Sequence, residues 1–361
     1  ARVAALEGGI GALAVASGMS AITYAIQTIA ESGDNIVSAS QLYGGTYNLL
    51  AHTLPQMGIE TRFADASKPE TFEALIDERT KAVYCESVGN PLGNVTNIKA
   101  LADIAHKHGV PLIVDNTVPS PALCRPFEHG ADIVVHSLTK YLGGHGTTIG
   151  GIIVDSGKFP WAEHKARFKR LNEPDVSYHG VVYTEALGPA AFIGRARVVP
   201  LRNMGAALSP MNAFQILQGI ETLALRMDRI CENAVKVAQF LKGHAKISWV
   251  NYAVLPDHAD YALVKSQMGG RASGIISFGL KAADPLAAGA AFQDALALFT
   301  RLVNIGDAKS LACHPASTTH RQLNETELAK AGVSRDMVRL SVGIEHIDDL
   351  IADLEQALAK A

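Results

Sequence analysis

Cysteine is scarce in this chain, and its spacing excludes two kinds of structural site. The 361 residues contain four cysteines. None forms a CxxC pair, whereas a disulfide framework or a paired-cysteine zinc site requires more cysteines at closer spacing. Free thiols in an enzyme-sized chain are typical of a reducing compartment, so we expect a cytoplasmic protein. The four are Cys85, Cys124, Cys231 and Cys313.

Long hydrophobic runs and an excess of one charge are lacking as well. Apolar stretches such as 10–15 and 110–114 are too short to cross a bilayer. The 32 lysines and arginines nearly balance the 35 aspartates and glutamates, which gives a net charge of -3 without a basic stripe. We therefore expect neither a membrane nor a nucleic acid as a partner.

Short apolar runs alternate with amphipathic stretches in the first half of the chain. This alternation predicts an α/β fold in which a mostly parallel sheet is covered by helices on both faces. The predicted strands are 35–39, 60–63, 82–85, 111–114, 133–135 and 150–154, and the predicted helices are 20–30, 47–56, 69–75, 98–108 and 121–128.

The pattern changes after an irregular stretch at 195–210. A long helical pattern at 211–242 is followed by mixed strand and helix signals. A chain of this length commonly forms two domains. We therefore predict a large domain at 1–210 and a smaller C-terminal α+β domain at 211–361, with strands near Trp249 and at 274–278 and helices at 283–298 and 348–359.

Two ionisable residues follow predicted buried strands. Asp115 comes directly after the apolar run 110–114, and Lys140 comes shortly after the strand 133–135. The carboxyl ends of parallel strands meet at one edge of the sheet, where ligands commonly bind. A buried carboxylate needs a partner, and a plain ion pair with Lys140 would supply one. The alternative is a pyridoxal 5'-phosphate (PLP) site, in which an aspartate keeps the pyridine nitrogen protonated and a lysine holds the cofactor as a Schiff base.

A PLP site also needs a cradle for the phosphate. The segment 16–20, with Ser17, Gly18 and Met19, precedes a helical pattern, and free N–H groups at a helix start bind phosphate well. An ordinary N-cap serine would explain the same pattern. Ser137 and Thr139 add hydroxyls beside Lys140. Tyr43, past another strand, is suited to stack on a flat cofactor, although ordinary packing is the alternative.

Competing motifs for nucleotides and metals are weaker. Residues 9–14 match the GxGxxA form of a dinucleotide fingerprint, which would indicate a nucleotide-dependent oxidoreductase, but no strand precedes them. The glycine-rich stretch 143–148 lacks GK[ST], so we expect His145 to be a loop residue. Cys313, His314 and His320 do not match a zinc pattern, and we predict no metal site.

Arg339 lies within the apolar run 337–343. An arginine that points into a core from a strand needs an anion, and its planar fork suits a carboxylate. The alternative is an exposed arginine on an edge strand.

Taken together, these features resemble the Cys/Met-metabolism family of PLP-dependent enzymes. The resemblance covers nearly the whole chain and is strongest toward the O-acetylhomoserine sulfhydrylases of that family. It is carried by four strings, which are HSLTKYLGGHGTTIGG at 136–151, SYHG at 177–180, GDAKSL at 306–311 and HPASTTH at 314–320.

The resemblance implies a fold and a function. The fold is the aspartate-aminotransferase fold, or PLP fold type I. The activity is PLP-dependent γ-replacement, which converts O-acetylhomoserine and sulfide or a small thiol into homocysteine and acetate in methionine and cysteine biosynthesis. The alternatives are O-succinylhomoserine sulfhydrylase, cystathionine γ-synthase or methionine γ-lyase activity, and a catalytically silent PLP-binding protein.

The resemblance also implies a role for single residues. Lys140 corresponds to the Schiff-base lysine and Asp115 to the partner of the pyridine nitrogen. Tyr43 corresponds to the ring-stacking tyrosine and acid–base candidate, and Thr117 lies near the ring. The phosphate binders would be Ser17, Gly18, Met19, Ser137 and Thr139, and the residues near the substrate carboxylate Asn90, Ser310 and Arg339, with Asn90 also near the cofactor 3'-oxygen.

The same resemblance implies an oligomer. Family members form at least a dimer, usually a homotetramer built from two dimers, because a Tyr-x-Arg motif reaches the phosphate of the neighbouring subunit. In the family this motif precedes the position of Ala1, and it does not occur in this sequence. We expect the phosphate to be held less firmly if the motif is absent from the protein.

Overall fold

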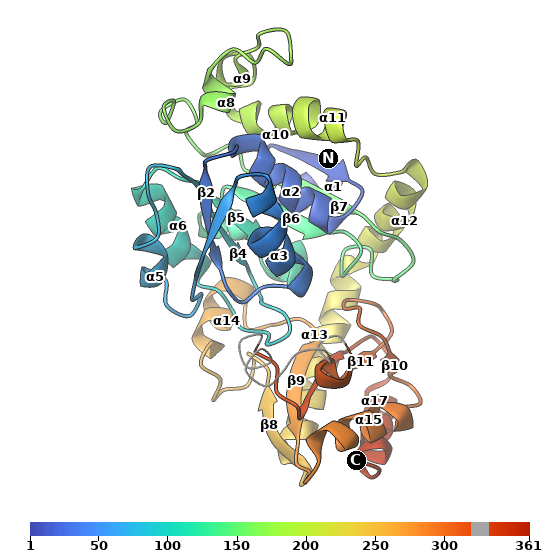
Figure 1. The fold of residues 1–361 in the computed structure, drawn as a ribbon. Helices are drawn as coiled ribbons and strands as arrows, with labels where there is room; N and C mark the ends of the chain where they lie inside the picture. Colours follow the sequence, from blue (N-terminus) through green and yellow to red (C-terminus); the bar gives the residue numbers. More distant parts are fainter. Residues whose placement is uncertain (319–331) are drawn as a thin grey trace. The chain divides into compact units, whose positions relative to one another are not determined.

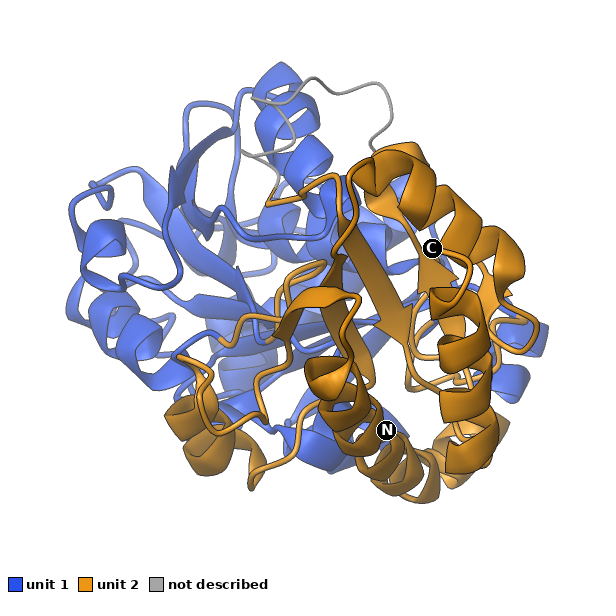
Figure 2. Cartoon of the chain, turned by 90° about the horizontal axis from the view of Figure 1, so that it is seen from below, with its two compact units in different colours: residues 1–87, 96–139, 148–216 blue, residues 88–95, 140–147, 217–361 orange. Residues whose placement is uncertain are grey.

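The computed structural model describes residues 1–318 and 332–361. The chain forms two compact units (Figure 2). Unit 1 comprises Ala1–Ser87, Thr96–Thr139 and Thr148–Ile216, and unit 2 comprises Val88–Val95, Lys140–Thr147 and Leu217–Ala361. The proposed division into domains 1–210 and 211–361 remains a prediction.

A seven-stranded sheet organises the described part of unit 1 (Figure 1). Its order is β1-β7-β6-β5-β4-β2-β3, and the five strands from β6 to β3 run parallel. β7 is antiparallel to both β1 and β6, so β1 has the direction of the parallel strands. The bounds are β1 Gly11–Val15, β2 Asn35–Ala39, β3 Glu60–Ala64, β4 Thr80–Glu86, β5 Leu112–Asp115, β6 Ile133–Ser137 and β7 Gly151–Asp155.

Helices cover both faces of this sheet, as the α/β prediction requires. α2 packs on β6 and β7, while α6 packs on β5 and β4 with α5 beside it (Figure 1). The apolar face of α6 is buried, and Asn97 caps its first turn by accepting from Ala100 N at 3.1 Å. In chain order, the helices up to residue 221 are α1 Arg2–Glu7, α2 Gly18–Ile29, α3 Gly44–Asn48, α4 Leu54–Gln56, α5 Glu70–Glu73, α6 Ile98–Lys107, α7 Ser120–Leu123, α8 Lys169–Asn172, α9 Tyr183–Leu187, α10 Ala191–Ala196, α11 Arg202–Met204 and α12 Pro210–Glu221, the last of which begins in unit 1 and ends in unit 2.

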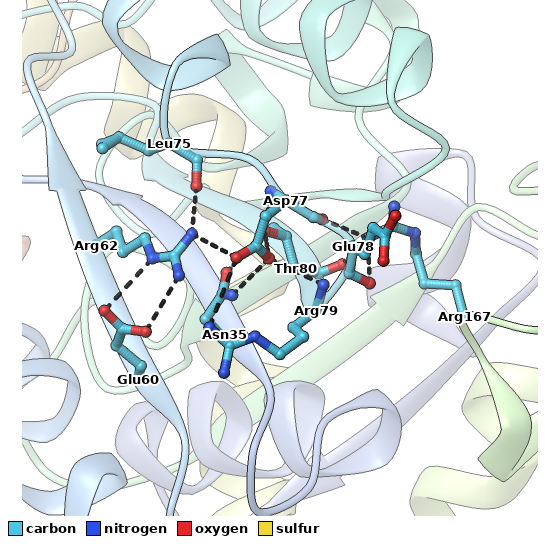
Figure 3. A network of polar contacts seen from close by, with 9 residues as sticks. All are labelled: Asn35, Glu60, Arg62, Leu75, Asp77, Glu78, Arg79, Thr80 and Arg167. Atoms are coloured by element: carbon cyan, nitrogen blue, oxygen red, sulfur yellow. Dashed lines mark hydrogen bonds and ion pairs between the residues drawn. The ribbon is translucent and has the colours of Figure 1, made fainter.

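A polar network joins the amino ends of β2, β3 and β4, where the first residues of each strand meet (Figure 3). Asp77 accepts from Asn35 Nδ2 at 2.8 Å and pairs with Arg62 Nη1 at 2.9 Å. Arg167 donates to the carbonyl oxygen of Asp77 at 2.9 Å. These contacts fix the sheet at the edge opposite to the carboxyl ends of its parallel strands.

A second sheet organises unit 2 in the order β10-β11-β12-β9-β8. β11, β12, β9 and β8 are antiparallel neighbours, and β10 is parallel to β11. Its core contains Phe278 and Phe292, whose rings meet edge to face at 5.8 Å. The elements are α13 Leu223–Gly243, β8 Ile247–Asn251, α14 Tyr261–Met268, β9 Ile275–Leu280, α15 Pro285–Ala295, β10 Thr300–Arg301, β11 Leu311–Cys313, β12 Met337–Ser341 and α17 Ile347–Leu358.

Three local predictions need correction. Residues 9–14 form no strand-to-helix turn, because Gly11–Val15 is itself strand β1, so the dinucleotide interpretation is wrong. The helix predicted at 121–128 is interrupted, since α7 ends at Leu123 and a separate 3₁₀ turn begins at Pro126. The helix predicted at 211–242 is two helices, α12 and α13, separated by Thr222.

Among the described residues, no helix combines the length and apolar character that crossing a membrane requires.

Candidate functional site

Asp115 ends β5 at the carboxyl edge of the unit 1 sheet. Its Oδ1 accepts from the N–H of Thr117 at 3.0 Å, and the Tyr84 hydroxyl lies 3.5 Å from its Oδ2. Burial raises the pKa of Asp115, while the hydrogen bonds of Thr117 and the charge of His136 act in the opposite direction. The carboxylate is thus held in place and still accepts a further proton donor.

Ser17 and Gly18 lie at the same edge, between β1 and α2. Ser17 caps the helix by accepting from Ser20 N at 3.1 Å. The first N–H groups of a helix, here those of Gly18 and Met19, have no acceptor within the helix. A Cβ on Gly18 would lie 2.8 Å from Cβ of Ser137, so glycine is required for this close approach. The arrangement is a helix start pressed against the end of β6.

The end of β6 is held by two hydroxyl groups. Ser137 N donates to Thr117 Oγ1 at 2.8 Å, which ties β6 to the segment after Asp115. Thr139 Oγ1 accepts from Gly150 N at 3.1 Å. These contacts place both predicted hydroxyl residues and Thr117 at one strand edge.

Tyr43 follows β2 at the same edge and lies at the start of α3. Its backbone N–H donates to Glu86 Oε1 at 2.6 Å. Its side chain is 50% exposed, so the ring is open to a ligand. Its predicted role in stacking stays a prediction.

Unit 1 therefore carries a donor set that fits PLP. A helix N-terminus with free N–H groups suits a phosphate, and a carboxylate with spare accepting capacity suits a pyridinium nitrogen. The close packing of Gly18 on Ser137 brings the helix start beside the strand whose chain leads to the lysine.

Lys140 follows Thr139 in the chain and belongs to unit 2. Within that unit its Nζ donates to the side-chain oxygen of Asn304. Burial lowers the pKa of Lys140 to about 8, and the positive charge of Arg339 contributes to this shift. About a tenth of this amine is therefore neutral and nucleophilic at pH 7, far more than of an ordinary lysine, whose pKa is about 10.4.

The turn after Lys140 is held by a buried arginine. Arg226 is 4% exposed and donates to the carbonyl oxygens of Tyr141 and Gly219, both at 2.7 Å. Gly144 N donates to the Lys140 carbonyl oxygen at 2.7 Å. The lysine therefore extends from a turn whose main chain is fixed on both sides.

Arg339 lies in the central part of β12 and is 7% exposed. Its Nη1 donates to Asn90 Oδ1 at 3.0 Å, and its Nη2 donates to the Val303 and Asn304 carbonyl oxygens at 3.0 and 3.3 Å. The structure thus brings two predicted carboxylate-site residues, Arg339 and Asn90, together in unit 2. The alternative of an exposed edge arginine is wrong.

Other predicted residues are engaged with protein groups. Ser310 is buried, and its hydroxyl donates to Glu345 Oε2 at 2.9 Å and accepts from Gly343 N at 2.8 Å. Its substrate role stays a prediction. His145 is exposed in its loop, with Nδ1 2.7 Å from the Gly143 carbonyl oxygen.

The weak metal motif can be followed only in part. His314 uses both ring nitrogens, for Ser317 Oγ and the Arg335 carbonyl oxygen, each at 2.8 Å. His320 lies outside the described residues. Among the residues that the structure describes, no group of three or more metal-binding side chains occurs.

Sequence reasoning missed two contributors. Asn304 binds Lys140 through its side chain and Arg339 through its main chain, and only its position just before the string at 306–311 gave a signal. The other is a buried pair, Glu7 and His136, which is linked to the segment after Asp115 because Asn116 Nδ2 donates to Glu7 Oε1 at 3.0 Å. His136 opened a recognised string, whereas nothing in the sequence pointed to Glu7.

Comparison with known proteins agrees with this geometry. The model of the Cys/Met metabolism PLP-dependent enzyme family matches residues 1–359. An O-acetyl-L-homoserine sulfhydrylase of Leptospira meyeri is 53% identical over 99% of this chain and 82% of its own length. A homocysteine/cysteine synthase of Saccharomyces cerevisiae is 49% identical over 99% and 82%.

A solved structure is similar throughout. A protein of Campylobacter jejuni described as a putative O-acetylhomoserine (thiol)-lyase, crystallised with N'-pyridoxyl-lysine-5'-monophosphate, superposes with a TM-score of 0.95 and 44% identity over 99% of this chain and 85% of that chain. The fold is therefore that of PLP fold type I. The chain belongs to the Cys/Met metabolism family of PLP-dependent enzymes, and PLP is its cofactor.

Proposed function

We propose that this chain catalyses γ-replacement on O-acetylhomoserine, with sulfide as the incoming nucleophile and homocysteine and acetate as products. One observation carries the chemistry. Asn304 contacts the Lys140 amine through its side chain and the Arg339 guanidinium through its carbonyl oxygen. An amine that attacks the cofactor aldehyde and a cation that binds a carboxylate are therefore close, as an α-amino acid substrate requires. The choice of ester and nucleophile is supported by the relatives named O-acetyl-L-homoserine sulfhydrylase.

We assign the unit 1 residues to the cofactor. The N–H groups of Gly18 and Met19 and the hydroxyls of Ser17, Ser137 and Thr139 bind the phosphate. Asp115 holds a proton on the ring nitrogen, with Thr117 fixing its orientation at 3.0 Å. Tyr43 stacks on the ring and is an acid–base candidate.

The unit 2 residues act on the substrate. Lys140 would hold the cofactor covalently at rest. PLP, when bound, would supply a protonated ring that withdraws electrons from the substrate Cα. Arg339 and Asn90 would bind the α-carboxylate.

Lys140 then moves protons. Its neutral Nζ removes the proton from Cα, and its lowered pKa supports this role. Lys140 or Tyr43 also takes a proton from Cβ, so that the Cγ–O bond breaks and acetate leaves as the anion. The sulfur of hydrogen sulfide then forms a bond to Cγ and loses one proton to solvent, and Lys140 and Tyr43 return the two protons taken from carbon to Cβ and Cα.

We further propose a cytoplasmic homo-oligomer, a tetramer built as a dimer of dimers. All four cysteines are free and buried, which fits a reducing compartment. Size-exclusion chromatography with light scattering tests the assembly.

The experiment for this function compares Lys140→Ala with Lys309→Ala. Lys309 is an exposed lysine of the same unit. Lys140→Ala loses both the absorbance of covalently bound cofactor and the formation of homocysteine, whereas Lys309→Ala keeps both. A yellow, active Lys140→Ala protein overturns the assignment. A cofactor-loaded wild-type protein that turns over no amino-acid substrate indicates the silent PLP-binding alternative.

Parallel assays separate the alternatives within the family. Product formation is measured with sulfide, cysteine or water as the nucleophile, and with the acetyl or succinyl ester. The cysteine arm detects cystathionine γ-synthase activity, and a further arm with methionine as the substrate and no added nucleophile detects γ-lyase activity as 2-oxobutyrate, ammonia and methanethiol. Because the yeast relative is a homocysteine/cysteine synthase, O-acetylserine is included as a second substrate.

A further inference from the structure

Tyr84 is a wholly buried tyrosine whose hydroxyl has no part in the proposed reaction. It lies within β4, covered on all sides by protein. A hydroxyl taken out of water costs free energy unless it finds a hydrogen-bond partner. The Tyr84 hydroxyl donates to Asp115 Oδ2 at 3.5 Å. A phenylalanine would fill almost the same space without that cost, so the hydroxyl calls for a reason beyond packing.

The register of the sheet places this hydroxyl on the face that carries Asp115. β4 and β5 are parallel neighbours, in which Tyr84 pairs with Ile113 and Glu86 pairs with Asp115. Because side chains alternate between the two faces of a sheet, these four side chains share one face. An aromatic side chain is long enough to reach the diagonal neighbour on that face. The contact between Tyr84 and Asp115 therefore follows from the pairing of the two strands.

The carboxylate of Asp115 is held through both of its oxygens. Oδ1 accepts from the N–H of Thr117, which follows β5, at 3.0 Å, and Oδ2 accepts from Tyr84 in the neighbouring strand. An ionised carboxylate offers about four lone-pair sites. One donor on each oxygen therefore fixes the plane of the group and leaves acceptor capacity for a pyridinium N–H.

The hydrogen bond between Tyr84 and Asp115 has a fixed direction. Burial raises the pKa of Tyr84 well above its usual value, and the charges of Asp115 and Glu86 raise it further. The phenol therefore keeps its proton and acts as the donor. At the other end, burial raises the pKa of Asp115, while the hydrogen bonds of Thr117 and Tyr84 act against that rise.

We propose that the Tyr84 hydroxyl is a positioning group of the cofactor site, which fixes the Asp115 carboxylate in its charged form so that the proton shared with PLP stays on the ring nitrogen. Tyr84 acts through Asp115 and is therefore a positioning residue. This inference rests on the role proposed above for Asp115. A hydrogen-bond donor stabilises the charged form of a carboxylate, which favours the proton on the partner of that carboxylate.

Tyr84→Phe removes this donor and keeps the aromatic ring. Asp115 becomes more basic, the shared proton moves from the ring nitrogen toward the carboxylate, and the ring withdraws electrons less strongly. One unit in the pKa of Asp115 changes the ratio of its two forms by a factor of about 10, so we expect kcat to fall about threefold to tenfold. KM for the amino acid stays nearly unchanged, because Arg339 and Asn90 are untouched.

The test uses the holoenzyme loaded with PLP that carries ¹⁵N at the pyridine nitrogen. The chemical shift of that nitrogen reports its protonation independently of turnover. In Tyr84→Phe the signal moves from the protonated toward the unprotonated position, in the direction that Asp115→Asn produces. In the double variant Tyr84→Phe/Asp115→Asn the signal coincides with that of Asp115→Asn alone, because the hydroxyl acts through the carboxylate.

Tyr183 offers a matched control in the same unit. It is 1% exposed, and its hydroxyl donates to Asp175 Oδ2 at 2.9 Å. Tyr183→Phe therefore breaks another buried tyrosine–aspartate hydrogen bond and leaves the ¹⁵N signal where it is in the wild type. A signal that moves as far in Tyr183→Phe as in Tyr84→Phe reports any lost buried hydroxyl and overturns the inference.

The remaining results have different consequences. A ¹⁵N signal that stays at the wild-type position in Tyr84→Phe, while Asp115→Asn moves it, overturns this inference and leaves the proposed function intact. A double variant whose signal lies beyond that of Asp115→Asn overturns it as well, since Tyr84 then acts by another route. A signal that Asp115→Asn also fails to move overturns the role of Asp115 and this inference with it.

Discussion

Arg339 Nη1 lies 3.0 Å from Oδ1 of Asn90, and this contact joins residues 249 positions apart in the chain. A guanidinium binds a planar, bidentate partner such as a carboxylate most strongly. In this structure the amide oxygen of Asn90 accepts a hydrogen bond from Nη1 of that guanidinium. A substrate carboxylate that binds Arg339 therefore shares the guanidinium with Asn90 or displaces its amide.

Arg339→Lys should weaken substrate binding more than catalysis. Lysine keeps the charge but loses the fork, and a hydrogen bond to a charged group contributes about 1.5 to 3 kcal/mol. KM for O-acetylhomoserine should rise about tenfold to a hundredfold in steady-state assays. Arg301→Lys, at an exposed arginine paired with Asp294, should leave KM as it is. An unchanged KM in Arg339→Lys would count against the carboxylate role.

The covalent attachment of PLP to the apoenzyme should depend on pH through Lys140. Only the neutral amine attacks an aldehyde, and the pKa of Lys140 is lowered to about 8 by burial and by Arg339. The attachment rate, followed by absorbance, should rise through pH 8, well below the ordinary lysine pKa of about 10.4.

Arg339→Gln tests whether the charge of Arg339 lowers the pKa of Lys140. It removes a positive charge that disfavours protonated Lys140, so the pKa of Lys140 rises and the midpoint of the rate profile moves to higher pH. Burial still holds the midpoint below the ordinary value. A midpoint that stays in place or moves down would contradict the coupling between the two residues.

Gly18→Ala should damage the phosphate cradle. The added Cβ would lie 2.8 Å from Cβ and 3.0 Å from Cα of Ser137, so the main chain has to move. Overpacking of this kind costs about 1 to 3 kcal/mol, and we expect the dissociation constant of PLP, measured by titration of the apoenzyme, to rise at least about tenfold.

The matched control is Gly243→Ala. Nothing lies within 4 Å of a Cβ at Gly243, at the end of α13, so PLP binding should not change and stability should change by less than about 0.5 kcal/mol. Equal PLP affinity in the two variants would show that the start of α2 does not hold the phosphate.

The strands of the parallel sheet could be predicted because their signal is local. Asn35–Ala39 matches its prediction at both ends, and every residue in it is buried, as expected for a strand covered on both faces. β1 could not be predicted in this way. Its antiparallel partner β7 lies about 140 residues later, and its residues GALAV also suit a helix. At 121–128 the helical signal was real, but Pro126 begins a separate turn.

The residues of the candidate site also fall into two groups, those with a local sequence signal and those without one. Asp115, Lys140 and Ser17 were found because each follows an apolar run or precedes a helix. Asn304 lies 164 residues from Lys140, and Glu7 lies 129 residues from His136. Neither carries a local pattern, since their roles arise only from tertiary packing.

The network around Asp77 should make the stability of unit 1 depend on acid pH. Burial acts to raise the pKa of Asp77, but the hydrogen bonds of Asn35 and Arg62 outweigh it and the net pKa is lowered (Figure 3). A carboxyl group whose pKa is lower when folded stabilises the protein above its unfolded pKa, near 3.9. That stabilisation is lost as the pH falls from about 5 toward the folded pKa.

Asp77→Asn should therefore lower the free energy of unfolding at pH 7, and lower it by less at pH 3, where part of the stabilisation is already lost. The side chain is 36% exposed, so solvent screens the pair and we expect a loss of about 1 to 2 kcal/mol. Denaturant unfolding at both pH values measures it. Asp103→Asn, in an exposed pair with Lys99, should cost less than about 0.5 kcal/mol at either pH. A loss of equal size at pH 3 and pH 7 would mean that Asp77 contributes through packing and not through its charge.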